Sequence, residues 1–217
     1  EAAMAGHSAV GIDRNPIARL IARVKTTRLE PSRIRAATTR LRARIDACSS
    51  FESPDVVNLK YWFYPRIIRE LSRIRYAMAE TRSDDLREFF GIVEKNSQRM
   101  ARLWHDFPQL GKVDIVDSDA RDIRKSLTFR AKSRSADLVF TSPPYASAQK
   151  YVRSSSLSLG WLGLCPAGAL IDLERQLIGR EHFRKSEVAR LPETGLPEVD
   201  EFLGTCFPAS PHRAVAI

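Results

Sequence analysis

The feature that most constrains the fold is an apolar run closed by two consecutive prolines. Residues 138–140 are Leu, Val and Phe, and Pro143 and Pro144 follow shortly afterwards. A continuous apolar stretch bounded by turn residues is typical of a buried strand in a parallel sheet. Proline has no backbone N–H to donate, so the strand must end there and a stiff, extended loop should follow. Because ligands of open α/β sheets bind at the carboxyl ends of strands, this loop is the first candidate site.

The loop itself combines one hydroxyl, two prolines and one aromatic ring, in the order Ser142, Pro143, Pro144, Tyr145. The serine can donate or accept a hydrogen bond, the proline carbonyls are free, and the tyrosine offers a flat face. These groups suit a flipped nucleobase whose exocyclic amine bonds to Ser142 and a proline carbonyl while its ring stacks on Tyr145. The alternative is an ordinary proline-rich loop with a half-buried tyrosine.

A second strand with an acidic tip is predicted over residues 8–13, ending at Asp13. Asn15 and Pro16 then form a helix cap and a first-turn proline, and apolar residues follow at helical spacing. A carboxylate at such a strand end can accept two hydrogen bonds from a ribose diol, so Asp13 is a candidate nucleotide ligand. A simple helix-capping role is the alternative.

A third strand is predicted over residues 113–116, followed by Asp117, Asp119 and Asp122. These carboxylates could form a solvated turn or a divalent metal site. No metal is expected, because the four histidines are scattered and no pair of cysteines has ligand spacing.

Taken together, three segments resemble the DNA amino-methyltransferases. Residues 141–145 match the catalytic Ser/Asn/Asp-Pro-Pro-Tyr/Phe loop, residues 11–18 the second motif and residues 118–121 the third. The resemblance implies an α/β, Rossmann-like, S-adenosylmethionine-dependent methyltransferase fold with a parallel sheet. It also implies a role for each matching residue: the catalytic loop is Ser142, Pro143, Pro144 and Tyr145, and the cofactor-binding residues are Asp13, Asp119 and Ala120.

The resemblance further implies direct methylation of the exocyclic amine of a flipped DNA base, more often cytosine N4 than adenine N6 when serine opens the loop. Lys150, Tyr151 and Arg153 would steady the target strand, in a loop leading into an apolar helix. Methylation of the cytosine ring would need a nucleophilic cysteine after a proline, whereas Cys165 precedes Pro166. Two alternatives stay open: an RNA or protein-glutamine amino-methyltransferase, and a non-catalytic nucleic-acid-binding fragment.

One motif of the family has no counterpart, because no Gly-x-Gly occurs in the 217 residues. In related enzymes a glycine-rich loop on the first strand approaches the methionine part of the cofactor. We therefore interpret the sequence as an internal fragment of a longer methyltransferase, such as occurs in restriction–modification systems. Its parallel sheet would be incomplete, and we expect the fragment alone to be inactive and to bind cofactor weakly.

The predicted domains are a partial methyltransferase core, a helical insertion and an irregular tail. The core comprises residues 1–29 and 112–190, the insertion residues 30–111, and the tail residues 191–217 with one short helix. Helices of the insertion should begin at Pro65 and Ser83. The aromatic run at residues 61–64 is expected to pack in the core in preference to stacking on bases.

The net charge of +9 is concentrated in one part of the chain. Residues 14–75 contain 15 Lys and Arg against 5 Asp and Glu, so this segment carries +10 and the remainder −1. Such a concentration favours a polyanion as partner, although a solvated face is the alternative. The sequence shows neither a transmembrane run nor a signal peptide, and three widely spaced cysteines predict a reducing, cytoplasmic setting.

Overall fold

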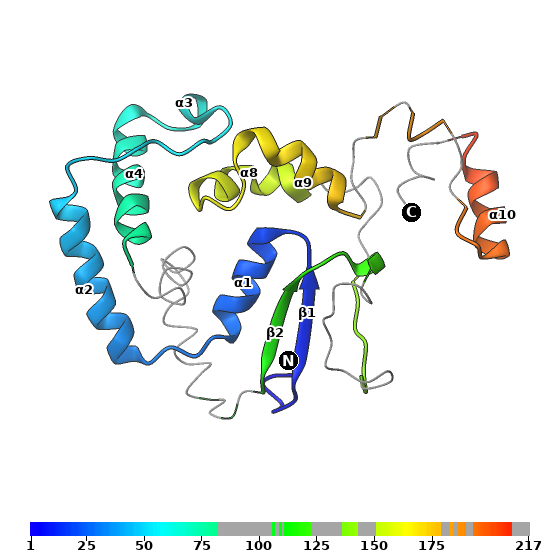
Figure 1. Cartoon of the computed structure of the whole chain (residues 1–217), viewed down its shortest axis with the longest axis horizontal. Coiled ribbons are helices and arrows are strands. Elements are labelled where there is room, and N and C mark those ends of the chain that lie inside the picture. The colour runs from blue at the N-terminus through cyan, green and yellow to red at the C-terminus, as the bar shows by residue number, and fades with distance from the viewer. Residues whose placement is uncertain are drawn as a thin grey trace. The chain divides into compact units, whose positions relative to one another are not determined.

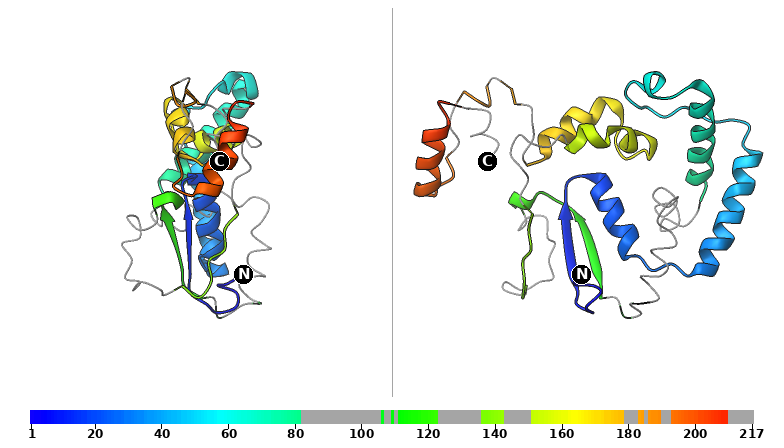
Figure 2. Two further views of the ribbon diagram at one scale, coloured as in Figure 1. Left: turned by 90° about the vertical axis from the view of Figure 1, so that its right-hand side faces the viewer. Right: turned by 180° about the vertical axis from the view of Figure 1, so that it is seen from behind.

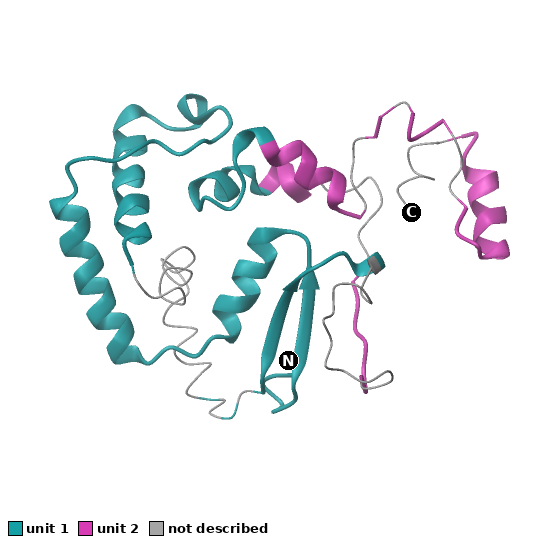
Figure 3. Cartoon of the chain, in the orientation of Figure 1, with its two compact units in different colours: residues 1–127, 155–168 teal, residues 128–154, 169–217 magenta. Residues whose placement is uncertain are grey.

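The computed structural model describes residues 1–81, 106, 109, 111–122, 136–142, 151–178, 183–184, 186–189 and 193–209. These residues form a mixed α/β structure that divides into two compact units (Figure 3). The first unit comprises residues 1–127 and 155–168, and the second comprises residues 128–154 and 169–217.

The first unit contains two parallel strands, β1 (Ala9–Asp13) and β2 (Val113–Asp117), which lie side by side in Figure 1. Their register pairs Ala9 with Val113 and Asp13 with Asp117, so both strands end at the same level. Gly11 faces a close neighbour, since a Cβ there would lie 2.8 Å from Ile115 Cδ1. The strands predicted near residues 8–13 and 113–116 are therefore confirmed.

Helix α1 (Pro16–Thr26) follows β1 and packs against both strands on one side of the sheet (Figure 2). Asn15 caps it, because its side-chain Oδ1 accepts a hydrogen bond from the Ile17 N–H at 3.1 Å. Leu20 and Val24, one turn apart, are buried beneath the helix at 4% and 3% exposure. The predicted cap, first-turn proline and apolar face are present.

Two helices, α2 (Pro31–Ala47) and α4 (Pro65–Ala79), pack together and run in opposite directions (Figure 1). Each begins with proline in the first turn, as expected at Pro65. Arg73 Nη2 donates hydrogen bonds to the carbonyl oxygens of Ile45, at 2.6 Å, and Asp46, at 3.4 Å. The guanidinium thus lies against the negative carboxyl end of α2, which favours the contact electrostatically.

Between these helices lies a single helical turn, α3 (Leu59–Trp62). Phe63 leaves this turn and makes an edge-to-face contact with Trp161 of α8 (Tyr151–Trp161), with 5.7 Å between ring centroids. Gly160 of α8 approaches the chain near Val56 so closely that a Cβ would lie 2.7 Å from Val56 Cγ2. These two contacts hold the α3 segment against α8.

The remaining elements are short. The 3₁₀ helices are η1 (Ala120–Asp122) and η2 (Ala167–Ala169), and the second unit contains α9 (Leu170–Gln176) and α10 (Pro197–Cys206). The loop before α10 is ordered by Asp200, whose carboxylate accepts hydrogen bonds from Thr194 and Gly195. These bonds hold the pKa of Asp200 below its usual value. A single short helix was expected in the tail, and α10 fits that expectation.

The prediction of a buried strand at residues 136–141 is wrong for this structure. The segment belongs to neither strand of the sheet, and Leu138, Val139 and Phe140 are 82%, 79% and 90% exposed. A parallel strand requires a neighbour for its backbone hydrogen bonds, and among the described residues no strand lies beside it. The helix predicted from Ser83 lies outside the described residues.

Candidate functional site

The candidate site in the first unit begins where the two parallel strands end. Asp13 closes β1 and Asp117 closes β2, and these two residues are paired in the register. Asp119 and Ala120 follow β2 by two and three residues. The carboxyl ends of two parallel strands therefore bring both predicted cofactor carboxylates to one edge of the sheet, as expected for an α/β ligand site.

Asp13 is exposed and only partly engaged. Its Oδ1 accepts a hydrogen bond from the Asn15 N–H at 2.7 Å, which supports the turn into α1. Oδ2 has no hydrogen-bond or ion-pair partner within the described part of the chain. The carboxylate thus caps the turn and keeps one oxygen for a ligand, so the capping role and the ligand role are compatible.

Asp117 is held by two arginines and forms part of the support of this edge. Arg19 Nη1 lies 2.8 Å and Arg14 Nη1 3.3 Å from Asp117 Oδ1. Arg19 also donates to the carbonyl oxygens of Asp13, at 3.0 Å, and Arg14, at 2.9 Å. With a side chain only 13% exposed, Arg19 links α1 to the ends of both strands.

Asp119 is engaged by Arg121 on both carboxylate oxygens. Oδ1 accepts from the Arg121 backbone N–H and Nε, each at 2.9 Å, and Oδ2 accepts from Nη2 at 2.6 Å. The hydrogen bonds from the Arg121 side chain hold the pKa of Asp119 below its usual value, although burial opposes the shift. Since each carboxylate oxygen can accept two hydrogen bonds, Oδ2 retains one acceptor position for a ligand amine.

Ser142 is the part of the predicted catalytic loop that the structure describes, and it is exposed. Pro143, Pro144 and Tyr145 lie outside the described residues. Ser142 belongs to the second compact unit, whereas Asp13 and Asp119 belong to the first. The assembly of these three residues around one cleft therefore stays a prediction.

The predicted nucleic-acid contacts lie at the start of α8, apart from Lys150, which falls outside the described residues. Tyr151 is half-buried and Arg153 is exposed in the first turn. Both were expected in a loop before the helix, and the structure corrects that expectation. Val152 between them is 3% exposed, which indicates why the helix begins early: it buries an apolar side chain from its first turn.

The aromatic run at residues 61–64 was expected to be core, and this is wrong for three of its four members. Tyr61 is 81%, Trp62 58% and Tyr64 83% exposed, whereas Phe63 packs on Trp161. One turn of helix followed by an extended residue before proline cannot turn four consecutive side chains inward. The exposure of these three rings could have been predicted from the short spacing between Asn58 and Pro65.

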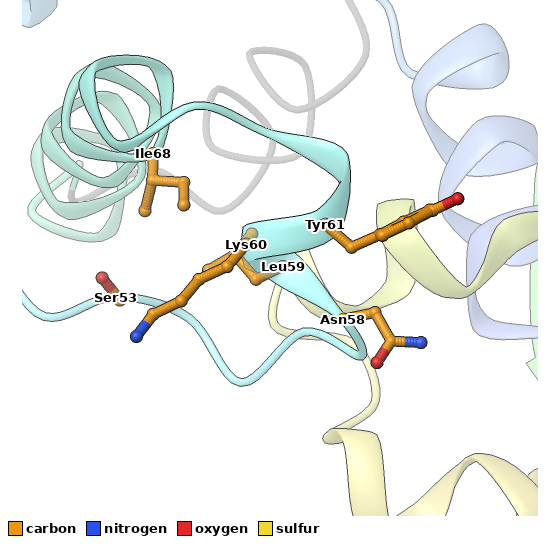
Figure 4. Close-up of a pocket in the computed structure, with 6 residues that line it drawn as sticks. All are labelled: Ser53, Asn58, Leu59, Lys60, Tyr61 and Ile68. Carbon is orange, nitrogen blue, oxygen red and sulfur yellow. The ribbon is translucent and has the colours of Figure 1, made fainter.

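Figure 4 shows a pocket of about 410 Å³ beside this turn. Its lining comes from the α3 turn, the preceding loop and α4: Ser53, Asn58, Leu59, Lys60, Tyr61 and Ile68. Lys60 and Tyr61 extend from α3 in different directions (Figure 4). A cation, hydroxyl and amide groups and one exposed ring thus border the same pocket.

The described residues give little support to a metal site, a nucleophilic cysteine or a membrane-spanning helix. No three His, Cys, Asp or Glu side chains there are grouped closely enough to hold a metal ion. Cys165 is buried, and burial raises the pKa of its thiol, which disfavours a nucleophilic thiolate. In the same part of the chain, none of the helices has both the length and the apolar character that a membrane span requires.

Comparison with known proteins finds one relevant similarity. The chain is 26% identical over 212 residues to the type II methyltransferase M.MvaI of Kocuria varians. The match covers 73% of this chain and 47% of the relative, so the chain spans about half the length of the curated relative that it matches. No protein-family model matches the chain, and no solved structure matches it.

Proposed function

We propose that the protein is an S-adenosylmethionine-dependent methyltransferase acting on the exocyclic amine of a DNA base, with cytosine N4 preferred to adenine N6. The observation that carries this proposal is the Ser142-Pro143-Pro144-Tyr145 loop in a chain that is similar to a type II methyltransferase. The two parallel strands and their terminal carboxylates support it, because parallel strands that end at one level are what a Rossmann-like ligand site requires.

The residues at this edge fit the nucleoside part of the cofactor. Asp13 Oδ2 is without a protein partner in the described residues and can accept from a ribose hydroxyl. Asp119 Oδ2 retains an acceptor position for the adenine amino group. When bound, S-adenosylmethionine supplies an electrophilic methyl group on its sulfonium.

In the proposed mechanism, the chain positions the acceptor amine and supplies no strong base. The amine's lone pair is delocalised into the base ring, so hydrogen bonds from the amine to Ser142 Oγ and the Pro143 carbonyl would localise that pair on nitrogen. Tyr145 would stack on the flipped ring and hold it in line. S-adenosylmethionine would supply the methyl group to the positioned amine, and the proton that the amine gives up would leave to water.

The test is methyl transfer from radiolabelled cofactor to duplex DNA, RNA and protein, using the product of the complete coding sequence. We expect label in DNA and, after digestion, N4-methylcytosine by mass spectrometry. Ser142→Ala should reduce kcat at least about tenfold, since a positioned hydrogen bond to the reacting group is removed. Label in RNA or protein but not in DNA would reject the DNA assignment.

A non-catalytic nucleic-acid-binding role is the second candidate, and the exposed arginines of α2 favour it. Methyl transfer by the complete gene product separates the two functions, and titration calorimetry of the 217-residue chain with S-adenosylmethionine tests its cofactor binding. Tight cofactor binding supports the methyltransferase and contradicts our expectation that this stretch binds weakly. DNA binding without methyl transfer by the complete gene product would support the second candidate.

A further inference from the structure

The exposed aromatic cluster Tyr61, Trp62 and Tyr64 has no role in the proposed chemistry. These three rings stand in one short segment, and their exposure of 58–83% is high for such large apolar side chains. An exposed group of aromatic side chains marks an interaction site more often than a single exposed ring does. The cluster is therefore a candidate binding site for another molecule.

The segment that carries the cluster is ordered on both sides. Asn58 adopts a left-handed conformation with φ 54°, and its carbonyl oxygen accepts from the N–H groups of Tyr61 and Trp62. Phe63 anchors the turn on Trp161, and Pro65 begins α4. Tyr61 and Trp62 meet edge to face with 5.2 Å between centroids. Rings held in this way lose little conformational freedom when a ligand binds.

Three exposed cations lie close to the cluster in the sequence: Lys60, Arg66 and Arg69. None has an ion-pair partner within the described residues. The carboxylates nearest in sequence are already engaged, because Glu70 pairs with Arg73 and Asp55 accepts from the Ala167 N–H. The cluster thus lies in a basic surrounding whose positive charge is not neutralised by neighbouring side chains.

The combination of exposed aromatic rings and exposed cations favours one class of ligand, a single nucleic-acid strand. Phosphates need cations, and unstacked bases need flat apolar faces, so a single nucleic-acid strand satisfies both groups at once. A duplex would satisfy the cations but would leave the rings exposed. The segment also belongs to the strongly basic stretch at residues 14–75, which complements a polyanion.

We propose that Tyr61, Trp62 and Tyr64, with Lys60, Arg66 and Arg69, form a binding surface for single-stranded or locally unpaired DNA. The proposal rests on the proposed function only for the choice of DNA. It adds a second contact to the substrate, made by residues other than those of the Ser142 loop. Unpaired bases stack on the rings while the cations contact the neighbouring phosphates.

The test measures binding of the 217-residue chain to fluorescent dT oligonucleotides and to a duplex of matched length, by anisotropy. Tyr61→Ala with Tyr64→Ala should weaken binding to the single strand at least about fivefold, because neither ring can then stack on a base. Binding to the duplex should change much less. Exposed rings contribute little to folding, so circular dichroism should be unchanged.

The cations are tested through salt dependence. Replacing Lys60, Arg66 and Arg69 with glutamine should make the plot of log K against log salt less steep. The negative slope should shrink in magnitude by about 0.7 for each phosphate that is no longer neutralised. For the ring substitutions, the matched control is Phe202→Ala. Phe202 is an exposed ring on the acidic helix α10, so its removal should leave binding to dT unchanged. The fluorescence of the wild-type chain should be quenched by dT, and Trp62→Phe should remove most of that quenching.

The results distinguish this inference from the proposed function. If the ring variants bind dT within about twofold of the unsubstituted chain, the inference is wrong even when methyl transfer to DNA is found. If the variants bind dT more weakly as expected but the complete gene product methylates no DNA, the surface stands and the methyltransferase assignment fails. Ring-dependent binding to anionic vesicles without binding to dT would instead assign the cluster to a membrane surface and overturn the inference.

Discussion

At the scale of single residues, Arg121 fixes the orientation and the ionisation state of the Asp119 carboxylate at the edge of the candidate site. The arginine uses three hydrogen bonds on one carboxylate, so the orientation of Asp119 is defined before any ligand arrives. The same bonds favour the ionised carboxylate and therefore hold its pKa below the usual value. A fixed, ionised acceptor is what recognition of an amino group requires.

This pair predicts a pH dependence of stability. A carboxyl whose pKa is lower in the folded than in the unfolded state stabilises the fold above its unfolded pKa, about 3.9, and loses that contribution as the pH falls through the folded pKa. Asp119→Asn should therefore destabilise the chain above about pH 4, and the difference in unfolding free energy from wild type should shrink below it. Urea denaturation from neutral to acidic pH measures this difference; a constant difference would contradict the prediction.

At the scale of elements, the packing of α8 on the α3 segment depends on the absence of one side chain. A Cβ at Gly160 would lie 2.7 Å from Val56 Cγ2 and 3.0 Å from the Asp55 carbonyl oxygen. Backbone cannot yield as a flexible side chain can, so the helix would have to move away. That movement would loosen the Phe63–Trp161 contact that anchors the aromatic cluster.

Gly160→Ala should therefore destabilise the chain by about 1–3 kcal/mol. The matched control is Gly204→Ala in helix α10, where, apart from the adjoining residues and the helix backbone, no atom of the described residues lies within 4 Å of the added Cβ. Because alanine has the higher helix propensity, that substitution should stabilise the chain by about 0.5–1 kcal/mol. Denaturation midpoints of both variants give the comparison, and an unchanged or raised midpoint for Gly160→Ala would show that the packing there is loose.

The exposed apolar segment at residues 138–140 offers a second test at this scale. Val139 is 79% exposed, so Val139→Lys should change the unfolding free energy by less than about 0.5 kcal/mol. Val24→Lys is the control, because Val24 is 3% exposed and an unpaired charge there should cost several kcal/mol. Comparable destabilisation by the two substitutions would mean that residues 138–140 form a buried strand in solution.

At the scale of the whole molecule, the uneven charge is the main functional indication. The four most exposed arginines of α2 are Arg33, Arg35, Arg40 and Arg42, and none has an ion-pair partner in the described residues. Their replacement by glutamine should make duplex DNA binding less dependent on salt. The negative slope of log K against log salt should shrink in magnitude by about 0.9 for each phosphate that is no longer neutralised. Arg175→Gln on α9, where the arginine already pairs with Asp172, should leave the slope unchanged. An unchanged slope in the α2 variant would identify a solvated basic face.

The parts that could be predicted from sequence are those that depend on near neighbours in the chain. Asn15 and Pro16 start α1 through one cap bond and one fixed φ angle, and Pro65 starts α4 with the same fixed φ angle. The strands near Asp13 and Asp117 were predicted because each follows a short apolar pattern.

The parts that could not be predicted depend on residues distant in the chain. Whether residues 138–140 are buried depends on a neighbouring strand, and the apolar pattern carries no information about whether that neighbour is present. The inward packing of Phe63 depends on where Trp161 lies, about 100 residues later. The engagement of Asp117 by Arg14 and Arg19 joins residues that are far apart in the chain, so local spacing does not specify it.

The sequence by itself therefore determined the cap and start of α1, the start of α4, the ends of β1 and β2, and the motif on which the proposed chemistry rests, because these depend on bonds and sterics between near neighbours. Only the tertiary structure decided that Asp13 and Asp117 end at the same level, that Asp117 is held by Arg14 and Arg19, and that Phe63 packs on Trp161. Burial and hydrogen-bond partners are set by contacts between distant segments, and the free energy of those contacts cannot be read from local pattern.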